Sequence, residues 1–101
     1  MLYLLYVQIP ADVGNSIDFE EGGPGKIMGY VFKRFKPQAA YAEAGKRNLF
    51  MVADLDEAQM TEFMIAASKQ MGTYAKFIPL IPAADIPEMA SKAIEEVKKA
   101  F

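Results

Sequence analysis

The chain contains no cysteine and no histidine among its 101 residues. Without cysteine it has no disulfides, no thiolate nucleophile and no soft metal site. Without histidine it lacks the commonest general base and metal ligand, so Ser-His and Cys-His pairs cannot be built. Any catalysis would have to use carboxylates, lysine, tyrosine or a bound cofactor, and the residues themselves point to no metal site and no cofactor.

An excess of positive charge is also missing. The 11 basic and 13 acidic residues give a net charge of −2, and they are spread along the chain. Because no basic face is available to neutralise phosphates, we expect no nucleic-acid partner. The apolar start, residues 1–10, has no basic flank and is too short to span a bilayer, so we expect no signal peptide or membrane anchor. These features predict a soluble, cytoplasmic protein.

Apolar residues are abundant for so short a chain. They make up 52% of the sequence, whereas charged residues make up only 24%. A chain of this length forms one domain, and we expect residues 1–101 to be a single unit. It carries more apolar surface than one copy can cover, so the composition predicts self-association into a homodimer or a higher homo-oligomer.

Hydrophobic periodicity and turn residues predict the order β-α-β-β-α-β-α. The expected strands are residues 2–9, 39–44, 49–54 and 73–81, and the expected helices are residues 26–35, 57–71 and 86–101. Residues 11–25 are rich in Asp, Asn, Ser, Glu and Gly, which predicts a long, mobile loop. Pro79 cannot donate to a strand ladder, so its strand is expected at the edge of the sheet.

Two helices carry sequence signals for their ends. Asp56 with Gln59, and Asp85 with Glu88, have the spacing of capping boxes, and Gly72 fits the stop of the helix over 57–71. Both helices also have an apolar stripe that predicts a buried face. The stripes consist of Met60, Phe63, Met64, Ala67 and Met71 in the first helix, and of Met89, Ala90, Ala93, Ile94, Val97 and Phe101 in the last.

The first six elements match a ferredoxin-like βαββαβ sandwich, followed by an extra C-terminal helix. Right-handed crossovers would place both helices of the sandwich on one face of an antiparallel sheet with strand order 4-1-3-2. Alternation along the strands then sorts the side chains into two sets. The helix-covered face would carry Tyr3, Leu5, Val7, Ala40, Ala42, Leu49, Met51 and Phe77, and the opposite face Leu2, Leu4, Tyr6, Gln8, Tyr41, Glu43, Phe50, Val52, Tyr74, Lys76, Ile78 and Leu80.

The second of these faces is mostly apolar or aromatic, whereas a solvated sheet face should be mainly polar. A continuous apolar patch of this kind usually marks an interface. The expected solution is a dimeric α/β barrel, in which two such sheets pack face to face.

Three segments resemble a known family. They are residues 35–41 (FKPQAAY), Leu49 to Leu55, and residues 77–82 (FIPLIP) followed by Asp85. They are similar to segments of an uncharacterised family of short bacterial proteins within the dimeric α/β-barrel superfamily, with Gln38 in place of an acidic residue. The resemblance covers almost the whole chain and implies the same ferredoxin-like, dimeric fold. It implies no activity.

Polar tips on the apolar face are the candidate pocket residues, because polar groups in an apolar cavity are typical of small-molecule sites. They are Tyr6, Gln8, Tyr41, Glu43, Tyr74 and Lys76, and the aromatic Phe50 on the same face is a further pocket candidate. An unpaired Glu43 in a dry barrel would have a raised pKa and could act as a general base. Alternatively, the tyrosines only pack their rings, and Glu43 pairs with Lys76 across a dimer seam and stays ionised. The two cannot meet within one chain, because they lie on opposite edge strands.

Three functions remain open from the sequence. The first is binding of a small apolar or aromatic metabolite in the dimeric barrel. The second, which the resemblance to the barrel superfamily would allow, is a cofactor-independent isomerase or oxygenase, with Glu43 or a tyrosine handling protons. The third is a structural subunit. Whether the chain is an enzyme stays open, because a fold does not settle a function.

Overall fold

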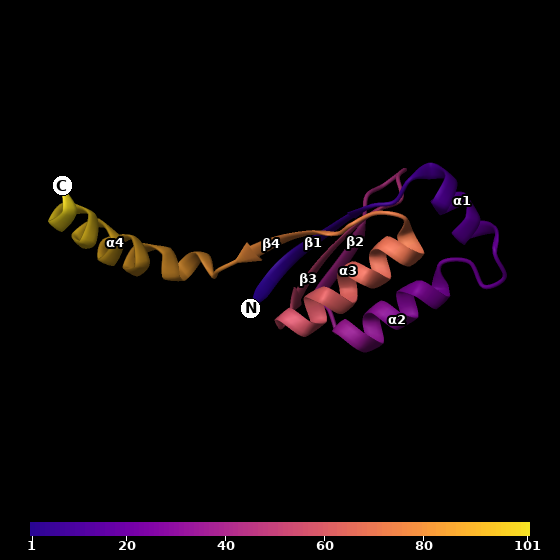
Figure 1. The fold of residues 1–101 in the computed structure, drawn as a ribbon, viewed down its shortest axis with the longest axis horizontal. Helices are drawn as coiled ribbons and strands as arrows, with labels where there is room; N and C mark the ends of the chain where they lie inside the picture. The colour runs from indigo at the N-terminus through magenta and orange to yellow at the C-terminus, as the bar shows by residue number, and fades with distance from the viewer.

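The computed structural model describes residues 1–101 and shows an α+β domain with an open, four-stranded antiparallel sheet (Figure 1). The strands are β1 (Leu2–Gln8), β2 (Ala39–Ala42), β3 (Asn48–Asp54) and β4 (Lys76–Leu80). The helices are α1 (Ala11–Phe19), α2 (Gly25–Phe35), α3 (Glu57–Met71) and α4 (Ile86–Ala100), with a 3-10 turn over Ala83–Asp85. The predicted strand order is confirmed as β2-β3-β1-β4, which is compatible with a ferredoxin-like fold.

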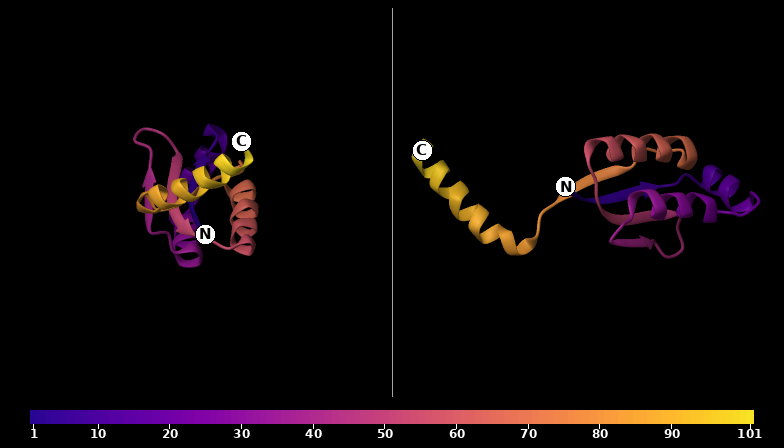
Figure 2. Two further views of the ribbon diagram at one scale, coloured as in Figure 1. Left: turned by 90° about the vertical axis from the view of Figure 1, so that its left-hand side faces the viewer. Right: turned by 90° about the horizontal axis from the view of Figure 1, so that it is seen from below.

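The core lies between the sheet and helices α2 and α3, which both lie on the same side of the sheet (Figure 2). Leu5 and Val7 of the central strand β1 are almost completely buried there. The ring of Phe63 from α3 meets that of Phe35 from α2 edge to face at 5.1 Å, and that of Phe77 from β4 at 6.1 Å. The predicted helix-covered face is therefore confirmed, although Ala42 at the end of β2 remains exposed.

Both predicted ends of α3 are confirmed. The Asp56 side chain accepts a hydrogen bond from the Gln59 amide at 2.8 Å, and the Gln59 side chain accepts one from the Asp56 amide at 3.0 Å. Gly72 follows the helix in the left-handed conformation, with φ of 69°. A β-carbon at Gly72 would collide with Val13 of α1, so this position requires glycine for space as well as for conformation.

The predicted loop over residues 11–25 is wrong for its first half, where the structure has helix α1. The helix starts directly after Pro10, whose carbonyl accepts a hydrogen bond from the Gly14 amide at 2.8 Å. Its apolar stripe consists only of Val13 and Ile17. Most of the other residues are polar, so the sequence shows too little apolar periodicity to predict a helix. Gly14 is buried because the side chain of Arg47 lies against it.

Helix α4 departs from the prediction in two ways. Asp85 makes no capping hydrogen bond, because it lies at helical angles within the preceding 3-10 turn instead of the extended geometry of a cap. The apolar stripe of α4 is not buried either, since every residue from Ile81 to Phe101 is exposed. Figure 1 shows the reason: the chain leaves β4 along the direction of that strand, and α4 projects away from the body.

The projecting helix makes the molecule long and narrow, with extents of 61 × 24 × 22 Å. The N-terminus lies near the end of β4 from which the chain continues to α4, and the C-terminus lies at the far tip (Figures 1 and 2). None of the helices combines the length and the apolar content needed to cross a bilayer.

Candidate functional site

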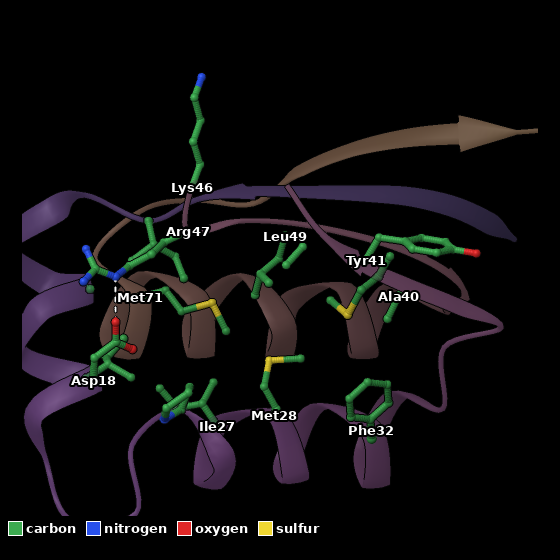
Figure 3. Close-up of a pocket in the computed structure, with 16 residues that line it drawn as sticks. Asp18, Ile27, Met28, Phe32, Ala40, Tyr41, Lys46, Arg47, Leu49 and Met71 are labelled. Carbon is green, nitrogen blue, oxygen red and sulfur yellow. Dashed lines mark hydrogen bonds and ion pairs between the residues drawn. The ribbon is translucent and has the colours of Figure 1, made fainter. Parts of the chain in front are cut away.

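A mainly apolar cavity lies between the β2–β3 edge of the sheet and helix α2 (Figure 3). Its volume is about 360 Å³ and it is partly open to solvent. Most of its lining side chains are apolar. The lining residues are Ile9, Gly14, Ile17, Asp18, Pro24, Ile27, Met28, Phe32, Ala40, Tyr41, Ala42, Lys46, Arg47, Leu49, Met51 and Met71.

Small side chains on β2 create this cavity. Ala40 lies on the helix-facing side of the edge strand, where a larger residue would fill the space above α2. Opposite it, α2 presents Ile27, Met28 and Phe32, which point toward the sheet in Figure 3. The alternation in AAYA is the sequence signal that could have located the cavity, because tiny residues facing a wide apolar helix leave a gap.

The polar end of the cavity is held by Arg47 from the β2–β3 hairpin. Its Nε donates to Asp18 Oδ2 at 2.8 Å, and its Nη2 donates to Asn15 Oδ1, also at 2.8 Å. Both partners belong to α1, so these contacts tie α1 to the hairpin and place one ion pair beside an otherwise apolar space (Figure 3). Charge-assisted hydrogen bonds are stronger than neutral ones, so these contacts fix the position of Arg47 at this end of the cavity.

Four of the predicted pocket residues form a row across the open face of the sheet. The register places Tyr41, Phe50, Tyr6 and Lys76 side by side on the successive strands β2, β3, β1 and β4. The rings of Tyr6 and Phe50 are stacked, with centroids 4.6 Å apart and planes at 16°. The structure therefore brings these four residues together, but Tyr6, Phe50 and Lys76 line none of the pockets of the chain.

The other predicted candidates lie at the margins of the open face. Gln8 is exposed at the end of β1, and Tyr74 precedes β4 with 73% of its surface exposed. Tyr41, at 72% exposed, is the only candidate that also lines the cavity under β2. A pocket on the open face would need a second layer above it, and that arrangement stays a prediction.

Glu43 lies in the hairpin, directly after β2. Its carboxylate accepts a hydrogen bond from Asn48 Nδ2 at 3.1 Å and pairs with Lys46 Nζ at 3.3 Å. These two contacts lower the pKa of Glu43 below its ordinary value. Within one chain, Glu43 is therefore paired with Lys46, and its pKa is lowered instead of raised. A pair with Lys76 across a dimer seam, or a raised pKa inside a closed barrel, stays a prediction.

A second, wider groove of about 680 Å³ runs along helices α1, α2 and α3. Beside it, Tyr30 donates to Glu62 Oε2 at 2.6 Å, and Arg34 forms an ion pair with Glu62 at 2.9 Å. The hydrogen bond from Arg34 is the main cause that lowers the pKa of Glu62, and burial is the main cause that raises the pKa of Tyr30. These contacts join α2 to α3, and they occupy both carboxylate oxygens of Glu62.

Two further findings concern metal binding and similarity to known proteins. No three acidic side chains lie together in a way that could hold a metal ion. No protein-family model, no curated protein and no solved structure matches the chain. The interpretation of the site therefore rests on its geometry.

Proposed function

We propose that this chain binds a small, mainly apolar or aromatic molecule in the cavity between β2 and α2. The cavity carries the proposal, because it combines an apolar lining with one fixed polar end at Arg47 and Asp18. Apolar clefts with a few convergent polar groups are the usual form of small-molecule sites. The function is the one expected from the sequence, and the location differs from the open sheet face expected there.

The size of the cavity limits the ligand. Known pockets span about 300–1,000 Å³, and an apolar cavity of about 150 Å³ is large enough to bind benzene. At about 360 Å³, this cavity fits a molecule on the order of two fused rings. A hydroxyl or carboxyl group on such a ligand would lie best at the end formed by Arg47, where hydrogen-bond donors are available.

The test uses 2-naphthol, a two-ring aromatic with one hydroxyl, and follows backbone amide resonances by NMR. We expect saturable shifts at Ala40, Leu49 and Met71, which line the cavity. Shifts confined to the open-face row of Tyr6 and Phe50 would place the site there and contradict the proposal, and so would the absence of any shift.

A matched pair of variants separates the two faces of the same strand. Ala40→Leu adds side-chain volume inside the cavity, so we expect it to weaken 2-naphthol binding at least tenfold, a loss of about 1.4 kcal/mol. Ala39→Leu adds the same volume one residue earlier, beside Val52 on the open face, and should leave binding unchanged. Equal effects of the two variants would contradict the assignment of the cavity.

We further propose that the binding domain is a ferredoxin-like homodimer. The strand order supports the fold, and the uncovered apolar face of the sheet supports a second copy of the chain. Light scattering at micromolar concentration should give about twice the mass of the 11.2 kDa chain. A stable monomer would contradict the homodimer but not the cavity.

A further inference from the structure

We propose that α4 of one chain packs on the open sheet face of a second copy, and that the exchange is reciprocal. The open face is defined by the outward apolar side chains Leu2, Leu4, Tyr6, Phe50, Val52, Ile78 and Leu80. This inference rests on the homodimer proposed above and names the surfaces that would form it.

Helix α4 has an apolar side that is suited to burial, but no other part of its own chain packs against that side. Its apolar residues lie on one side, and Ile94 and Val97 are 52% and 57% exposed. The opposite side carries charges, including the pair of Glu88 and Lys92 at 3.2 Å. A helix of 15 residues without tertiary contacts is only marginally stable in water, so α4 requires a partner surface.

The open sheet face is also an apolar surface that no part of its own chain covers. Both long helices of the body lie on the other side of the sheet, so the apolar rows across β4, β1 and β3 have no covering layer (Figure 2). Ile78, for example, lies opposite Leu4, which in turn lies opposite Val52. An apolar sheet face of this kind needs a helix or a second sheet above it.

The dimensions of the two surfaces agree. Fifteen helical residues span about 22 Å, and the seven residues of β1 span about 24 Å. Only Ile81 and Pro82 separate β4 from the turn that starts α4, and α4 continues outward from the strand (Figure 1). A helix that leaves in this direction reaches a neighbouring molecule without a reversal of the linker, whereas its own sheet requires one.

The surface area of the chain is consistent with a second copy as the occupant. The chain exposes 7230 Å², whereas a compact monomer of 11.2 kDa exposes about 5700 Å². Its radius of gyration is 17.6 Å, against about 13 Å for a compact domain of this length. The excess of about 1500 Å² per chain would bury an area typical of stable homodimers when two chains combine.

Symmetry also favours this occupant over a different protein. Each chain offers one apolar helix stripe and one apolar sheet face, so two chains satisfy both surfaces in a closed, two-fold assembly. Packing the two open faces against each other, as in a dimeric α/β barrel, would cover the sheets but leave both α4 stripes in water. Reciprocal exchange covers all four surfaces.

The first experiment measures mass by light scattering on the full chain. We expect a dimer for the unmodified protein and a monomer for the double variant Ile94→Asp, Val97→Asp. Lys92→Asp is the matched control, because it changes the net charge by the same −2 on the polar side of α4 and should remain dimeric. A double variant that stays dimeric overturns the exchange but leaves the homodimer standing, whereas a monomeric unmodified chain overturns both.

The second experiment locates the contact. The photoreactive residue p-benzoylphenylalanine replaces Ile94, and isotopically light and heavy chains are mixed before irradiation. We expect mixed-isotope cross-links from position 94 to Leu4, Val52 or Ile78, and none when the probe replaces Glu95 on the polar side. Cross-links within one chain, or between two α4 helices, would overturn the exchange. Neither experiment involves the cavity, so 2-naphthol binding can succeed or fail independently.

Discussion

Helices α3 and α4 have the same length of 15 residues, and both are amphipathic, yet the structure uses them differently. In α3, Phe63, Ala67 and Met71 are buried against the sheet, whereas α4 buries no residue at all. The apolar residues are confined to one side more sharply in α4 than in α3. The strength of an amphipathic pattern therefore does not tell whether its own chain supplies the cover.

The difference has a physical origin in the connections. Helix α3 lies between β3 and β4, so both of its ends are anchored to strands and the helix must lie on the sheet. Helix α4 does not lie between two strands of the sheet, so the connections do not force it onto the sheet. The following predictions test how far the two helices differ.

The largest difference is expected for a core truncation in α3. Phe63→Ala removes a side chain that is 1% exposed and packs between Phe35 and Phe77, so it should lower the free energy of unfolding by about 3–5 kcal/mol. Ile65→Ala, on the same helix but 55% exposed, should change it by less than about 0.5 kcal/mol. Urea unfolding measures both, and equal losses would show that α3 does not form the core described above.

A smaller difference is expected at the two N-caps. Asp56→Ala removes the hydrogen bond that the Asp56 carboxylate accepts from the Gln59 amide at the start of α3, and it should cost about 1 kcal/mol of stability. Asp85→Ala removes a side chain that makes no capping bond on α4, so its cost should be near zero. If thermal unfolding shows equal losses for the two variants, Asp85 caps α4 in solution and the difference between the helix starts does not hold.

The smallest effect is expected from the cluster of Tyr30, Arg34 and Glu62, which joins α3 to α2. The pKa of Glu62 is lowered in the folded chain, so its stabilising contribution is present above the unfolded pKa of a glutamate and is lost as the pH falls through the folded value. Glu62→Gln should therefore flatten the acid limb of the stability profile.

The alkaline limb of the same profile tests Tyr30. Its pKa is raised in the folded chain, so its contribution is present below the unfolded pKa of a tyrosine and is lost as the pH rises through the folded value. Tyr30→Phe should flatten this limb. Glu95→Gln on α4 serves as the control for both variants and should keep the profile of the unmodified chain. A control that changes either limb as much as the cluster variants would contradict this assignment.

Much of the fold could be predicted from local sequence. Alternation in β1 identified the buried side of the sheet through Leu5 and Val7, and the pair of Asp56 and Gln59 identified the start of α3. These features depend on neighbours in the chain, so a short window contains the whole signal. Helix α1 was missed because only Val13 and Ile17 carry its period, and its buried Gly14 is explained by Arg47, which lies far along the chain.

The chemical character of the candidate site could be predicted from the sequence, but its location could not. Apolar surface with a few polar groups was expected, but it was placed on the open face, where Tyr6 and Phe50 stack without enclosing a space. The cavity lies on the other face because the small side chain of Ala40 leaves a gap above helix α2. A gap is a property of two surfaces brought together, and no single stretch of sequence contains it.

By itself, the sequence determined the order of the strands, the two sides of each strand, the apolar stripe of α4 and the absence of histidine and cysteine chemistry. Only the tertiary structure decided where empty space remains, which charges pair and which apolar surfaces stay uncovered. Glu43 illustrates the limit, because its pairing with Lys46 depends on the geometry of the hairpin. Local periodicity is set by the backbone of each element, whereas cavities, ion pairs and uncovered faces arise from the way distant elements meet.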